Sequence, residues 1–212
     1  MPRLTRAQRQ EQTRADLVNA AKARFLQHGY AATSLEDIAD DAGYTKGAVY
    51  SNFGNKPNLC REVLEAIHHE KLGELALLAI SESDVSARFE AVTAWFESTV
   101  GDVGWTMLEL EFVVLSRNDK ELTTMITELR NDAAASTVSL LRSIAADLGV
   151  TETQLAQSDI AGMLDNLANL LLSAGIGLGI QRAVDPSVPV LPATDAIKQL
   201  LNLLAALGAT QS

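Results

Sequence analysis

The stretch TSLEDIADDAGYTKGAVYSNF, Thr33 to Phe53, decides the fold because it reads as two short helices joined by a tight turn. Ser34 followed by Asp37 is a Ser-x-x-Asp cap for the first helix, and Gly43 permits a left-handed turn after it. Thr45 can cap the second helix. The pattern therefore predicts a helical hairpin of the helix-turn-helix kind.

Helical periodicity extends along the rest of the chain, since apolar residues recur at spacings of three and four and no alternating strand pattern appears. Besides the hairpin, we expect helices over Gln12–His28, from Asn55 onward, and over Val85–Gly101, Trp105–Arg117, Lys120–Leu148, Thr153–Arg182 and Ala193–Leu207. The predicted fold class is all-α. We expect a three-helix head over residues 1–62 and a larger helical body over residues 63–212.

Charge is distributed unevenly along this acidic chain. The formal net charge is -10, yet residues 1–61 carry nine Lys and Arg against six Asp and Glu, a net of +3, which leaves -13 on the remainder. Non-specific nucleic-acid binding depends on neutralising phosphates, so the overall charge argues against it. The asymmetry instead indicates an anion-facing head and a body with another task.

The second helix of the hairpin has the composition of an element that approaches DNA closely. Gly47 and Ala48 remove steric bulk, which lets backbone or a thymine methyl come near. Tyr50, Asn52 and Lys56 offer hydroxyl, amide and ammonium donors to phosphate. In a helix-turn-helix unit the second helix enters the major groove, so these residues form a candidate DNA-binding site. A plain helical hairpin with a solvated surface is the alternative.

The segment from Thr13 to Leu64 resembles the DNA-binding head of the TetR (tetracycline repressor) family of bacterial transcription regulators. Its first helix ends in the pattern F...GY..T, and the hairpin follows IA..AG...G.VY..F..K..L. The resemblance implies phosphate contacts from Thr33 and Thr45 at helix starts, groove-facing Lys46, Gly47 and Ala48, and backbone clamping by Tyr50 and Lys56.

Two positions depart from the family pattern. Asn52 stands where the family often has histidine, and because it keeps a donor we expect little loss of binding. Pro57 replaces a usual charged residue after Lys56, and we interpret it as a rigidifying change.

The acidic run in the first hairpin helix is unfavourable for a DNA-facing unit, because carboxylates repel phosphates. Glu36 and Asp37 favour the positive end of their own helix. Asp40 and Asp41 gain no such benefit, and we expect them to point to solvent away from the duplex.

In this family the carboxyl-terminal helices hold a small-molecule pocket, for which the body has suitable side chains. The candidate pocket residues are Trp95, Phe96, Trp105, Leu108, Phe112, Met125, Met163 and Asn166. Ligand sites are mostly apolar with few polar groups, but so are cores, and core packing is the alternative for each of these side chains taken singly.

The last two predicted helices carry faces suited to a four-helix dimer interface. The candidates are Leu171, Leu172, Gly175 and Gly179 on one helix and Ile197, Leu200, Leu201 and Leu204 on the other. Packing within one chain is the alternative. A twofold dimer would present two recognition helices to half-sites about 34 Å apart.

The sequence offers little support for catalysis, and we expect no cofactor and no metal. His68 and His69 are adjacent, so on a helix they diverge by about 100° and cannot chelate one metal together. The single cysteine, Cys60, fits a reducing cytosol. The most apolar stretch, Leu170 to Ile180, is short of the roughly 20 residues that span a bilayer. We therefore expect a cytoplasmic protein that is neither an enzyme nor a membrane protein.

These features together predict a homodimeric, ligand-responsive regulator of transcription, a repressor that a small molecule releases from double-stranded operator DNA. A helical carrier or enzyme whose head does not bind DNA is the alternative from another class. An activator, or a regulator that responds to a protein partner, would keep the head and lack the pocket.

Overall fold

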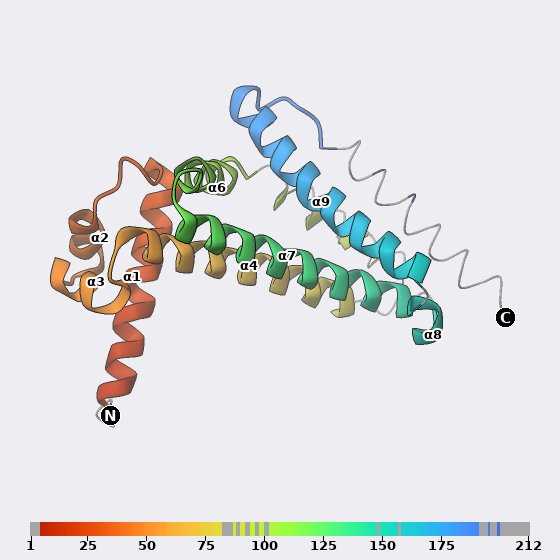
Figure 1. Cartoon of the computed structure of the whole chain (residues 1–212), viewed down its shortest axis with the longest axis horizontal. Helices are drawn as coiled ribbons and strands as arrows, with labels where there is room; N and C mark the ends of the chain where they lie inside the picture. Colours follow the sequence, from red (N-terminus) through yellow and green to blue (C-terminus); the bar gives the residue numbers. More distant parts are fainter. Residues whose placement is uncertain are drawn as a thin grey trace. The chain divides into compact units, whose positions relative to one another are not determined.

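The computed structural model describes residues 5–81, 87, 90–91, 94–95, 98–99, 102–147, 149–156, 158–190, 195 and 199. Within these residues every regular element is a helix, which confirms the predicted all-α class. The helices are α1 (Arg6–His28), α2 (Leu35–Ala42), α3 (Lys46–Phe53), α4 (Lys56–Ser81), α6 (Val103–Ser116), α7 (Lys120–Asp147), α8 (Glu152–Leu155) and α9 (Ser158–Val184), coloured along the chain in Figure 1.

The chain divides into two compact units. The first comprises Met1–Ile67 with Met107–Leu129, and the second comprises His68–Thr106 with Arg130–Ser212. Three helices, α4, α6 and α7, each contribute one part to the first unit and another to the second. The boundary expected between residues 62 and 63 therefore falls inside α4, and as a division of function it stays a prediction.

The capping signals of the hairpin are present in the structure. Ser34 accepts a hydrogen bond from the backbone N–H of Asp37, whose carboxylate accepts one in return from the Ser34 backbone. Gly43 ends α2 in the left-handed conformation, with φ of 73°. Thr45 caps α3 by accepting from the backbone N–H of Ala48. These contacts confirm the predicted helix starts and the predicted turn.

The core of the first unit fixes the hairpin against α1 and α4. Side chains from these four helices are fully or almost fully buried, among them Leu17, Phe25, Ile38, Ala39, Val49, Phe53, Leu59 and Val63. Burial of one large apolar side chain contributes about 1.5–3 kcal/mol. The two short hairpin helices are therefore stabilised mainly by tertiary packing, since helices of this length are marginal alone.

Some predicted helix boundaries were wrong. Helix α1 begins at Arg6 rather than near Gln12, because Thr5 forms a capping box with Gln8. The single helix predicted over Thr153–Arg182 is two helices, α8 and α9, and a further capping box, at Thr151, starts the first of them. The helices predicted over 85–101 and 193–207 fall largely outside the described residues.

Helix α9 contributes two buried residues to the core cluster of the second unit. Leu164 and Ala168 of α9 are buried together with Leu141, Ala145 and Leu155. By length and composition alone, Ala161–Val184 within α9 could also cross a membrane, with a mean hydropathy of 1.4. The apolar composition thus extends beyond the stretch from Leu170 to Ile180, which alone is too short to span a bilayer. Core helices of soluble proteins pass the same test, so it is weak evidence for a membrane span.

Candidate nucleic-acid interface

Helix α3 has one side in the core of the first unit and another side in solvent. Val49 and Phe53 are buried, whereas Lys46 and Gly47 are exposed and Tyr50 is 50% exposed. A Cβ on Gly47 would meet no atom nearer than the Thr45 Oγ1, at an ordinary 3.7 Å. Internal packing therefore does not require a glycine at this position.

Lys46, the first residue of α3, forms an ion pair with a residue of α2. Its Nζ donates to Glu36 Oε1 at 2.9 Å. This hydrogen bond raises the pKa of Lys46, with a further contribution from the charge of Glu36. Sequence reasoning assigned Glu36 to the helix dipole and missed the pair, because nothing in a one-dimensional pattern shows which side chains meet across a turn.

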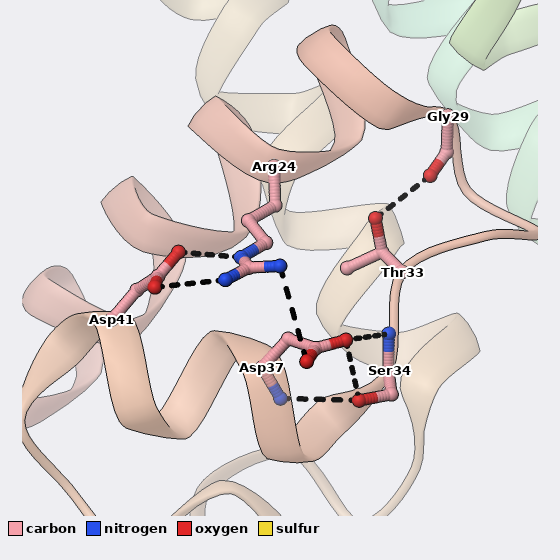
Figure 2. A network of polar contacts seen from close by, with 6 residues as sticks. All are labelled: Arg24, Gly29, Thr33, Ser34, Asp37 and Asp41. Carbon is pink, nitrogen blue, oxygen red and sulfur yellow. Dashed lines mark hydrogen bonds and ion pairs between the residues drawn. The ribbon is translucent and has the colours of Figure 1, made fainter.

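Thr33 is placed differently from what the resemblance implies. The residue is 3% exposed, and its hydroxyl donates to the carbonyl oxygen of Gly29 at 2.8 Å (Figure 2). The cap of α2 is the next residue, Ser34. Thr33 thus closes the connection between α1 and α2 and does not present its hydroxyl at a helix start. Thr45, by contrast, is exposed at the start of α3.

Asn52 also turns inward. Its Nδ2 donates to the Ala48 carbonyl oxygen at 2.8 Å, and its Oδ1 is buried with no hydrogen-bond partner. The backbone carbonyl of Asn52 accepts from Arg14 of α1, whose guanidinium also lies 4.6 Å from the centre of the Phe53 ring. The expectation that the Asn52 amide is presented to phosphate is therefore not met in this conformation.

Lys56 is half-buried at the start of α4. Its Nζ lies 4.1 Å from the centre of the Tyr30 ring, a cation–π contact, and burial lowers its pKa. Burial likewise raises the pKa of Tyr30 to about 12. Lys56 thus packs on the α1–α2 connection, and the phosphate contact expected of it stays a prediction.

The α1–α2 connection also contacts α6 within the first unit. The backbone N–H of Ala31 donates to Glu111 Oε2 at 2.8 Å, and the rings of Tyr30 and Phe112 meet edge to face at 5.9 Å. Glu111 and Phe112 thus both contact the loop before α2. The part of Phe112 in a ligand pocket stays a prediction.

Arg24 of α1 engages most of the acidic run in α2. Its guanidinium donates twice to the Asp41 carboxylate, once at 2.9 Å, and lies 3.9 Å from Asp37 (Figure 2). The hydrogen bond to Arg24 lowers the pKa of Asp41, and the hydrogen bonds from Ser34 lower that of Asp37. Asp40 and Asp41 are both exposed as expected, and the ion pair of Asp41 with Arg24 is a contact that the sequence pattern did not predict.

The predicted pocket residues divide between the two units. Leu108, Phe112 and Met125 are buried in the first unit. In the second unit, the Trp95 indole N–H donates to Glu74 at 3.0 Å and the Trp105 ring meets His68 edge to face. The remaining candidates are half-buried Met163, exposed Asn166 and Phe96, which lies outside the described residues. The ligand pocket stays a prediction.

The dimer candidates on α9 have different environments. A Cβ on Gly179 would lie 2.0 Å from Thr106 Oγ1, so this glycine serves the contact of α9 with α6 inside the second unit. Gly175 has no neighbour within 4 Å on its Cβ side. Leu171 and Leu172 are half-buried. Exposed apolar residues that sequence reasoning missed are Leu170, Ile176 and Ile180. Ile197, Leu200, Leu201 and Leu204 lie outside the described residues.

Comparison with known proteins relates the first unit to a family of regulators. Residues 17–63 match the family model described as bacterial regulatory proteins, tetR family. Over 85 residues the chain is 42% identical to the HTH-type transcriptional regulator TtgR of Pseudomonas putida, which is 40% of either chain. Over 51 residues it is 49% identical to the probable acrEF/envCD operon repressor of Escherichia coli, covering 24% of this chain and 23% of the relative. The chain thus matches two fifths or less of the length of these relatives.

Solved structures extend the similarity to almost the whole chain. A transcriptional regulator from a Rhodococcus species aligns with a TM-score of 0.66 at 20% identity, over 92% of each chain, which supports the fold. A structure described as a SmeT–triclosan complex aligns with a TM-score of 0.58 at 26% identity, over 92% of this chain and 90% of that one.

Proposed function

We propose that this chain, a member of the TetR family of bacterial regulatory proteins, is a homodimeric repressor that binds operator DNA through α3 and is released by a small molecule. The observation that carries the proposal is the outer side of α3. Lys46, Gly47 and Tyr50 are exposed there although Val49 and Phe53 anchor the helix in the core. A rigidly held helix with a slim polar side suits insertion into a major groove.

Homodimerisation is part of the proposal because one recognition helix contacts only one half-site. A twofold pair of chains would read two half-sites about 34 Å apart, or a multiple of that distance. The exposed Leu170, Ile176 and Ile180 give α9 an apolar surface for a second copy. Burial of this surface in a dimer would also explain its composition without a membrane.

Release by a small molecule follows the logic of population shift. A ligand that binds the second unit would favour a conformation whose two heads no longer match the operator. The expected reduction in DNA affinity is the coupling free energy, typically about 1–3 kcal/mol. The triclosan complex of the structural neighbour SmeT supports a search among small apolar aromatic compounds.

A titration against duplex DNA at two salt concentrations tests the proposal. Binding should weaken steeply with salt, since each phosphate contact contributes about -0.9 to the slope of log K against log salt. Lys46→Gln should reduce affinity, and the matched variant Lys120→Gln, at an exposed lysine that starts α7, should not. The alternative, a carrier or enzyme with an inert head, predicts no salt-dependent binding by any of the three proteins.

A further inference from the structure

The ion pair between Glu36 and Lys46 lies in solvent on the hairpin. The two side chains are 65% and 46% exposed, and the Nζ–Oε1 distance is 2.9 Å. An exposed pair of this kind contributes little to folding stability, because water screens it and ordering two long side chains opposes it. A contribution to folding stability therefore does not explain why Glu36 and Lys46 are paired.

Glu36 differs from the other acids of α2 whose partners are described. Asp37 belongs to the capping box of its own helix, and Asp41 is held by Arg24 of α1. Glu36 alone among these three reaches across the turn to the first residue of α3. The pair thus joins the recognition helix to the helix before it at the side of α3 that is exposed.

A lysine donor beside a carboxylate acceptor matches the major-groove edge of a G·C base pair. Guanine presents N7 and O6 as acceptors, and cytosine presents its N4 amino group as a donor. The 2.9 Å between Lys46 Nζ and Glu36 Oε1 is an ordinary N–H···O separation, as is the O6 to N4 distance within the base pair. Lys46 can therefore hydrogen-bond to guanine and Glu36 to cytosine while the ion pair between the two side chains is kept.

The same reasoning disfavours the other base pairs. A T·A pair also places an acceptor beside a donor, but the adenine N7 acceptor would then face the Glu36 carboxylate, and the second acceptor that guanine offers to Lys46 is missing. Reversed pairs would set donor against donor and acceptor against acceptor. The absent side chain at Gly47, beside Lys46, leaves room for the base edge.

We propose that Glu36 and Lys46 act as a couple that reads one G·C base pair in each half-site, Lys46 donating to guanine and Glu36 accepting from cytosine. The inference rests on the proposed function, since α3 must lie in the major groove. It goes further by assigning base readout to a residue of α2 and by naming the base pair. Because the couple is neutral, its contact contributes base discrimination more than phosphate attraction.

The test begins with selection of bound fragments from random duplex DNA by the full-length protein. From the selected duplex, four versions are made that differ only at the G·C pair of each half-site. Wild type should bind the G·C version about fivefold or more tightly than the others. Glu36→Ala should reduce that preference about fivefold or more, whereas Asp40→Ala, an equal charge change at an exposed acid of the same helix, should keep it.

A charge-conserving exchange sharpens the test. The double variant Glu36→Lys with Lys46→Glu keeps the ion pair and the net charge but reverses the order of donor and acceptor. It should prefer C·G at the position where wild type prefers G·C. Equal preference in wild type, the Glu36→Ala variant and the exchange variant would overturn the inference while leaving DNA binding intact. Failure of wild type to select any sequence would instead overturn the proposed function.

Discussion

Arg24 shows how one cation makes an acidic helix more compatible with the proposed DNA binding by the hairpin. It lies on α1, and its guanidinium contacts both Asp41 and Asp37, so its single positive charge offsets one of these two negative charges. Lys46 offsets a second negative charge, at Glu36. The local field near α3 is therefore less repulsive to phosphate than the composition of α2 suggests.

The Arg24–Asp41 contact predicts a pH-dependent contribution to stability. The folded protein lowers the pKa of Asp41, so this contribution is fully present above the usual aspartate pKa of about 3.9 and is lost as the pH falls through the lowered folded value. Asp41→Asn should reduce the midpoint of urea unfolding at pH 7. The difference in midpoint between wild type and variant should become smaller at low pH, where Asp41 of the wild type is protonated. Asp40→Asn serves as the charge-matched control, and an equal effect of both variants would contradict the assignment.

Thr33 allows a structural role to be separated from a phosphate contact. Thr33→Val removes the donor to the Gly29 carbonyl and should lower the free energy of unfolding by about 1–3 kcal/mol. The salt slope of DNA binding should stay unchanged, because the hydroxyl is buried. Thr33→Ser retains the donor and should recover most of the stability. A lower salt slope in Thr33→Val would instead support the role implied by the family resemblance.

At the scale of helices, the connection between α1 and α2 fixes the hairpin to the rest of the first unit. It contacts α6 through the Ala31 N–H bond to Glu111 and the packing of Tyr30 on Phe112, and Lys56 of α4 covers the Tyr30 ring. Two helices, α6 and α4, thus contact one short loop. A change in this loop should therefore affect how α2 and α3 are held.

A substitution at Gly29 tests the role of the α1–α2 connection directly. Its φ of +82° is rarely adopted by other residues, and an added Cβ would lie 2.5 Å from Glu111 Oε1. The flexible carboxylate could move aside, but Ala31 would then lose its acceptor. Gly29→Ala should lower the free energy of unfolding by about 1–3 kcal/mol in a urea titration. The double variant with Glu111→Ala should not restore stability, and full restoration would show that the clash matters more than the backbone conformation.

At the scale of the whole molecule, the dimer proposal assigns the interface to the side of α9 where Leu170, Ile176 and Ile180 are exposed. At about 100° per residue these three side chains lie within about 120° of one another around the helix, whereas Gly175 points about 100–140° away from each of them. Ile176→Asp should weaken self-association about tenfold or more in sedimentation equilibrium, since an unpaired charge is costly to bury in an interface. Val114→Asp, the same kind of change at an exposed residue of α6, is the matched control. Equal dimerisation of both variants would exclude Ile176 from the interface.

Local signals made much of the head predictable. Caps at Ser34 and Thr45 and the turn at Gly43 are encoded by neighbours in sequence, and the structure has them where expected. Contacts between distant residues were not predictable in this way. Periodicity alone does not specify how helices cross. The crossing determines that Arg24 pairs with Asp41, that Thr33 is buried and that Thr106 packs against Gly179. For the same reason the pocket candidates could not be divided between the two units in advance.

The central claim is that the outer side of α3 lies in the major groove, and site-directed cleavage of DNA tests it most directly. Cys60 is fully buried and its pKa is raised, so a Ser51→Cys variant, with the new thiol at an exposed position of α3, can be labelled selectively with a DNA-cleaving metal chelate. On the selected operator, we expect strong cleavage at two symmetric places, one in each half-site. A Ser139→Cys control, labelled at an exposed position of α7, should give no such pattern. Cleavage by the Ser51→Cys protein that is no stronger or more localised than that of the control would contradict the account.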